Sequence, residues 1–157
     1  MTTVATKPWD HLAERTIVGA MMDRLYLELA GNLEPHLRVL RQIADAGLLA
    51  GHFHDQRCRY AYAAIMRLLD LGKPIDEPAV AWYCARSVSA DHHGVTLEWL
   101  LKVSDDLTSI AGVDWYAREI VRLAGVRRVQ AAGEAIMRDG DAGRALALIE
   151  GVAGDKS

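Results

Sequence analysis

The stretch FHDQRCRYAYAAIMRLLDLGKPID, residues 53–76, contains the local signals of one complete helix and the start of another. Asp55 is a residue type that caps the N-terminus of a helix. The apolar residues that follow recur at spacings of three and four, which is the period of a helix with one buried face: Cys58, Ala61, Ile65, Leu68 and Leu69. Gly72 is suited to end this helix, and Asp76 can cap the next one. The stretch therefore predicts two helices joined by a short turn.

The Gly72–Lys73 pair in this turn raises the alternative of a nucleotide-binding loop. Such a loop needs a glycine five residues before the second glycine, and a serine or threonine directly after the lysine. Position 67 is Arg and position 74 is Pro, which has neither a hydroxyl group nor a backbone N–H. We therefore interpret Gly72, Pro74 and Asp76 as a structural turn, and we expect neither a nucleotide nor any other cofactor.

The same helical period runs through the rest of the chain, and no alternating β-branched runs occur. We expect a first helix over about residues 10–30, a second that Asn32 caps, and a long helical pattern from Asp114. The fold class is all-α. The 157 residues form one domain, with a globular head of about five to six helices over 1–112. A helical hairpin arm follows over 113–153, and a frayed tail over 154–157.

Composition and charge narrow the class of protein. Apolar residues make up 51% of the chain and charged residues 25%, as in soluble globular proteins. No apolar run approaches the roughly 20 residues that cross a bilayer, and the N-terminus lacks the apolar core of a secretory signal. We expect a cytoplasmic protein without a membrane partner, with Cys58 and Cys84 as buried thiols. The net charge of −3 argues against a general nucleic-acid coat, which needs a basic surface.

Two local clusters allow other interpretations. Five arginines between residues 118 and 138 face only two glutamates, so this stretch is either a solvated helix face or a partner surface. Direct DNA contact there is expected to be weak or absent. The second cluster is the set of possible metal ligands His52, His54, Asp55, Cys58, His92 and His93. Zinc needs about four ligands brought together, so we favour a capped helix start with surface histidines over an enzyme or metalloprotein. We find no catalytic constellation.

Four segments, in order, resemble the N-terminal domain of DnaB-type replicative helicases. AERTIVGAMM (13–22) is similar to the family's Ala-Glu opening, which ends in apolar residues around a glycine. Residues 53–76 resemble its Phe-x-Asp-x-Arg-His-Arg segment, with Cys58 where the family commonly has His. GVTLEWLLKVSDDL (94–107) and DWYAREIVRLAGVRRV (114–129) resemble two further segments. One departure is that the stretch between Met22 and His52 is longer than is usual in the family.

The resemblance implies a helical head and a hairpin arm that pairs between subunits into a collar and recruits the C-terminal domain of primase. It also implies no catalytic activity in this chain, because the family's ATPase domain and its nucleotide-binding motif are absent from this sequence. We expect the partner surface at Tyr116, Ile120, Leu123, Arg127 and Arg128. The alternative is a stand-alone replication factor of a phage or mobile element, which binds the host helicase, as a helicase loader does, through the same fold.

Overall fold

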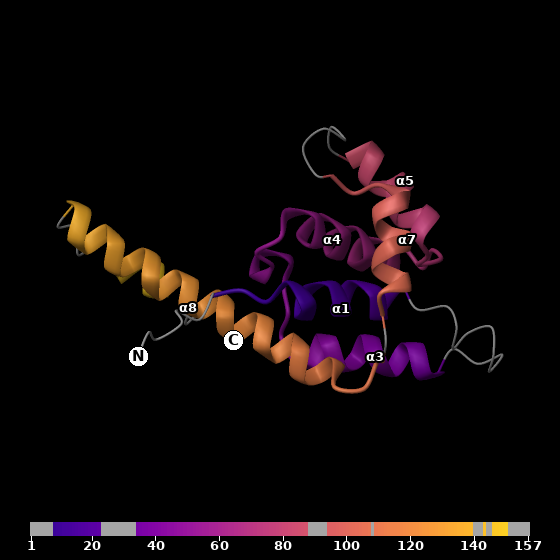
Figure 1. Cartoon of the computed structure of the whole chain (residues 1–157), viewed down its shortest axis with the longest axis horizontal. Helices are drawn as coiled ribbons and strands as arrows, with labels where there is room; N and C mark the ends of the chain where they lie inside the picture. The colour runs from indigo at the N-terminus through magenta and orange to yellow at the C-terminus, as the bar shows by residue number, and fades with distance from the viewer. Residues whose placement is uncertain are drawn as a thin grey trace.

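The computed structural model describes residues 8–22, 34–87, 94–107, 109–139, 143 and 146–150, and every regular element in these ranges is helical. The elements are α1 (His11–Met21), α3 (Glu34–Asp45), the 3-10 turn η1 (Ala50–His52), α4 (Gln56–Asp70), α5 (Glu77–Ser87), α7 (Leu97–Asp105) and α8 (Val113–Asp139). Figure 1 shows a head built from the first six elements, from which the far end of α8 projects. The prediction of an all-α fold is confirmed.

Helix α1 is the centre of the head, because α3, α4, α7 and α8 all pack against it. Its side chains are buried on nearly every side, as expected of a helix with neighbours all round: Ala13, Glu14, Ile17, Val18, Ala20 and Met21. A Cβ atom on Gly19 would lie 3.2 Å from the backbone oxygen of Val103. Glycine therefore permits α1 and α7 to approach closely at this point.

The first helix ends at Met21, whereas the sequence predicted helix to about residue 30. Residues 23–33, which include the predicted cap Asn32, lie outside the described part of the chain. Helix α3 is described from Glu34, with Pro35 in its first turn, where the missing N–H of proline costs no hydrogen bond.

The N-terminal cap of α4 and the turn between α4 and α5 are built from local hydrogen bonds. The Asp55 carboxylate accepts the backbone N–H of Arg57 at 2.8 Å and so caps α4. At the other end, Gly72 has φ +65°, a conformation that costs other residues free energy, and its N–H donates to Leu69 O at 3.0 Å. Asp76 Oδ1 then accepts the N–H of Ala79 at 2.8 Å at the start of α5. Residues 72–76 therefore make a compact interhelical turn.

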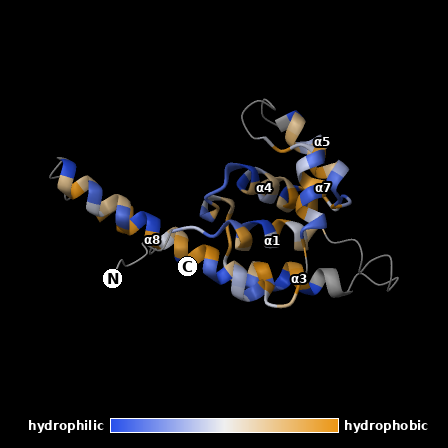
Figure 2. Cartoon of the chain, in the orientation of Figure 1, coloured by the Kyte–Doolittle hydropathy of each residue, from blue (hydrophilic) through white to orange (hydrophobic). Residues whose placement is uncertain are grey.

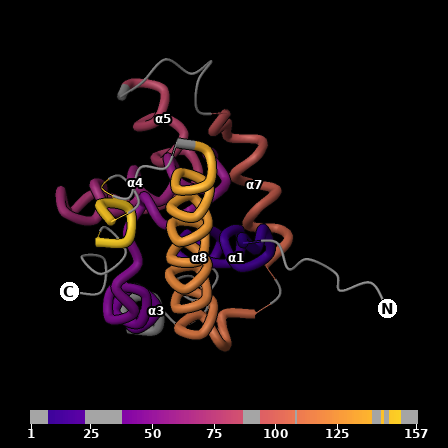
Figure 3. The backbone as a smooth tube through the Cα atoms, turned by 90° about the vertical axis from the view of Figure 1, so that its left-hand side faces the viewer, coloured from indigo at the N-terminus to yellow at the C-terminus, as the bar shows by residue number. Residues whose placement is uncertain are grey.

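Helix α8 has 27 residues and is about 40 Å long. Figure 3 shows that it lies between α1 and α3, both of which it contacts. Val113, Ala117 and Ile120 belong to the core of the head, so the first part of α8 is a head helix as well as the base of the arm. The described residues 146–150 are helical and lie beside the distal part of α8 in both views (Figures 1 and 3).

Candidate functional site

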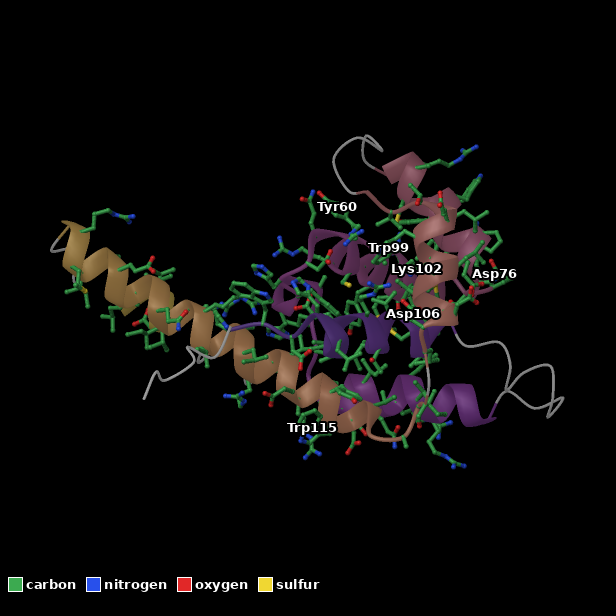
Figure 4. The ribbon with its side chains drawn as sticks, viewed as in Figure 1. Tyr60, Asp76, Trp99, Lys102, Asp106 and Trp115 are labelled. Atoms are coloured by element: carbon green, nitrogen blue, oxygen red, sulfur yellow. The ribbon has the colours of Figure 1, made fainter. Side chains whose placement is uncertain are left out.

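The surface predicted on α8 mostly faces inward. Ile120 is 2% exposed and Leu123 is 6% exposed, because this stripe of α8 packs on the head. Tyr116 is half-buried against the core, with its ring edge-on to that of Trp115 at 5.2 Å. Figure 4 places Trp115 on the outer side of α8. For Ile120 and Leu123 this burial is a correction, since such side chains offer no surface to a partner.

Arg127 also points into the protein. Its two terminal nitrogens donate to the backbone oxygen of Pro8 at 2.8 Å and to that of His52 at 2.6 Å. The guanidinium thereby joins α8 to the segment before α1 and to η1, two parts of the chain far away in the sequence. Arg128, the next residue, is half-buried. Arg127 is therefore a positioning residue between head and arm, and its charge is not free for a partner.

Glu14 completes this polar junction, which we define as Glu14, His52, Asp55 and Arg127. The Glu14 side chain is 1% exposed, and its two oxygens accept the backbone N–H groups of His54 at 3.1 Å and Asp55 at 2.9 Å. Burial raises the pKa of Glu14, while these hydrogen bonds and the nearby Arg127 act in the opposite direction. The carboxylate fixes the backbone that leads into α4.

The predicted metal-ligand cluster is dispersed over different environments. His52 is buried, and its Nδ1 accepts the N–H of Leu49 at 2.8 Å. His54 is exposed and stacks on Trp9, with ring centroids 4.1 Å apart. Burial raises the pKa of the Cys58 thiol, which disfavours the thiolate that a metal needs. No group of three or more potential ligands occurs among the described residues, and His92 and His93 lie outside them.

Several arginines of α8 already have acidic partners on the same helix. The Arg118 guanidinium lies 3.2 Å from the Asp114 carboxylate, and Arg122 Nε donates to Glu119 at 3.0 Å. With Arg127 turned inward, much of the positive charge of this stretch is neutralised or buried. The arrangement agrees with a solvated helix face better than with a phosphate-binding surface.

The distal part of α8 carries three exposed apolar residues. Val129 is 54% exposed, Ile136 is 50% exposed and Met137 is 89% exposed. We call these three residues the arm surface. Figure 2 shows that the distal part of α8 mixes apolar and polar residues, outside the contacts of the head. The period of the apolar stripe does not reveal where α8 leaves the head, so the sequence alone could not separate Ile120 and Leu123, which the head covers, from the arm surface.

Within the described residues, no helix combines the length and the apolar character that crossing a membrane would need.

A helical head with one long helix that projects from it defines a class of small all-α domains. The family model of the DnaB-like helicase N terminal domain matches residues 6–122, which is more than half of the chain. The chain therefore belongs to this family.

One solved structure with a similar fold is the crystal structure of the N-terminal domain of DnaB helicase from Mycobacterium tuberculosis. The TM-score is 0.67 at 23% sequence identity, and the match covers 94% of this chain and all of that one. No curated protein matches the sequence.

Proposed function

We propose that this chain is a non-catalytic assembly and docking domain of a replicative DNA helicase. In this proposal it acts in the cytoplasm, associates with further copies of itself through the arm, and binds primase or a helicase loader. Membership in the family supports the helicase context. The observation that carries the self-association is the arm surface, which the described part of the chain leaves uncovered.

The argument for self-association is physical. Val129, Ile136 and Met137 are each at least half exposed, on a helix that has left the core of the head. Ala132 and Ala135, by contrast, are each 1% exposed, so the face of α8 that the folded chain leaves open is the one that carries the arm surface. Exposed apolar side chains gathered on one element are typical of an interaction site. A second copy of the same arm is the simplest occupant, because most oligomers are symmetric.

The test is multi-angle light scattering of the full chain over a concentration series, alone and with the C-terminal domain of a primase. We expect a dimer or larger oligomer alone, and a heavier complex with primase. The proposal would be overturned if the chain stayed monomeric at every concentration and did not bind the primase domain.

The proposed role in docking leaves no need for DNA contact by this domain. If α8 contacted DNA phosphates, binding would weaken steeply as salt is raised. We expect at most weak binding to a DNA duplex, measured by fluorescence anisotropy at two salt concentrations.

A further inference from the structure

A second candidate interaction site lies on the head, between the C-terminal end of α4 and α5. It is a cleft of about 340 Å³ lined by Leu68, Leu71, Lys73, Trp82, Tyr83 and Arg86. The turn between the two helices contains Asp76. Figure 4 places this residue at the opposite end of the molecule from the distal end of α8. The cleft is therefore separate from the arm surface.

The walls of the cleft are apolar and partly open. Leu68 is only 2% exposed, whereas Leu71 is 47% exposed and Trp82 is 51% exposed. The volume is at the lower end of the roughly 300–1,000 Å³ found for ligand sites. A site of this size suits one or two large side chains of a partner and not an extended surface.

The charged lining residues of the cleft are both cations. Lys73 and Arg86 are exposed, and within the described ranges no carboxylate lies at ion-pair distance from either of them. The Arg86 Cζ atom lies 4.3 Å from the centre of the Trp82 ring, which holds the guanidinium at the edge of the apolar wall. Two uncompensated cations beside an apolar cleft are notable in a chain whose net charge is −3.

We propose that this cleft binds a short acidic peptide segment of a partner protein. An aromatic or branched apolar side chain of the peptide enters between Leu71 and Trp82, and carboxylates on either side of it pair with Lys73 and Arg86. Tryptophan, tyrosine and arginine are the residues that most often dominate binding energy at interfaces, and all three line this cleft. Opposite charge supplies the selectivity for an acidic partner. Because the cleft is remote from the arm, self-association does not block it.

The probe is a phage-displayed library of random dodecapeptides, selected on the immobilised full chain. We expect the enriched peptides to carry one or two aromatic or leucine residues flanked by Asp or Glu. Synthetic copies of the enriched peptides, labelled with a fluorophore, then give dissociation constants by anisotropy. An acidic peptide with the anchor changed to serine is the matched negative probe.

Three variants locate the binding to the cleft. Lys73→Glu and Arg86→Glu should each weaken the selected peptides by about tenfold or more, and Trp82→Ala by about thirtyfold. All three side chains are exposed, so the circular dichroism spectrum and the melting temperature should stay close to those of the unmodified chain. The controls are Arg38→Glu, an exposed arginine on α3, and Trp115→Ala, an exposed tryptophan on α8, and both should leave the affinity unchanged.

Several results would overturn the proposal. One is a selection that enriches no peptides, or that enriches basic ones. Another is a set of selected peptides that bind Arg86→Glu and Trp82→Ala as tightly as the unmodified chain. A third is loss of self-association in the same variants, which would assign the cleft to a second copy of the chain.

Discussion

Arg127, on α8, donates a hydrogen bond of 2.6 Å to the backbone oxygen of His52, which lies in η1 at the entrance to α4. The same guanidinium holds the backbone oxygen of Pro8 at 2.8 Å. One side chain thus ties together three parts of the chain that meet where the arm leaves the head.

Replacing Arg127 with methionine should lower the free energy of unfolding by about 2–3 kcal/mol. Methionine keeps most of the side-chain volume but leaves two partly buried carbonyl oxygens without their charged donor. Urea unfolding followed by circular dichroism measures the change. Arg118→Met is the control, because the exposed pair of Arg118 with Asp114 should contribute no more than about 0.5 kcal/mol. If Arg127→Met and Arg118→Met lowered the free energy of unfolding equally, the stabilising role of Arg127 in the junction would be contradicted.

Stability should fall as the pH drops below about 6.5, in part because of His52. Burial, followed by the charges of Arg128 and Arg127, holds the pKa of His52 below its ordinary value of 6.5. The unfolded chain therefore takes up a proton at a higher pH than the folded one, so acidification through this range favours unfolding. Protonation of Nδ1 would also remove the acceptor for the N–H of Leu49.

His52→Asn tests this pH dependence, since the Asn carbonyl oxygen can replace Nδ1 as acceptor but does not titrate. Unfolding in urea between pH 5 and 8 should show a shallower slope for this variant. Burial also lowers the pKa of His54, so a His52/His54 double variant should flatten the slope further. If the double variant kept the same slope of stability against pH as the unmodified chain, neither histidine would be the source of the pH dependence.

Replacing either of two helical glycines with alanine should change the stability of the protein, but in opposite directions. A Cβ on Gly19 would lie 3.2 Å from Val103 O, so Gly19→Ala should separate α1 from α7 and destabilise the protein by about 1 kcal/mol or more. Gly133, in the distal part of α8, has no neighbouring atom within 4 Å of such a Cβ. Gly133→Ala should therefore stabilise by up to about 1 kcal/mol through helix propensity. Thermal unfolding of both variants at one protein concentration checks the signs.

A double variant, Ile136→Asp with Met137→Asp, should convert the proposed oligomer to a monomer. The two substitutions place charges where the arm surface would be covered by another copy, and burying an unpaired charge is costly. Light scattering at several concentrations is the measurement. Leu12→Asp, at an exposed leucine of α1, is the control and should leave the oligomer intact. If the double variant kept the mass of the unmodified chain, the arm surface would not be the contact.

The N-terminal cap of α4 and the turn between α4 and α5 could be predicted from the sequence because all of their interactions are local. Asp55, Gly72 and Asp76 each act on backbone groups within a few residues, and such effects can be read directly from residue types and spacing. The helical period likewise identifies α8 as a helix with one apolar stripe. These features do not depend on where the rest of the chain lies.

The polar junction could not be predicted in the same way. Arg127 finds its partners 75 and 119 residues earlier, and Glu14 finds its partners 40 and 41 residues later. A stripe such as Ile120 and Leu123 has the same spacing whether it faces its own head or a second copy. The sequence therefore predicted a partner surface at Ile120 and Leu123, whereas in the folded chain the head itself buries these two side chains. The glutamate in AERTIVGAMM was a signal, because a charged residue within an otherwise apolar helical stretch needs a reason.

Helix α8 is continuous from Val113 to Asp139 and contains no proline. A helix without a break transmits a tilt along its whole length, because bending it would disturb its hydrogen bonds. The head and the distal end of α8 should consequently turn as one rigid piece if two arms pair as proposed. The crossing angle of the paired arms would then set how far apart the heads stand and which way their α4–α5 clefts face.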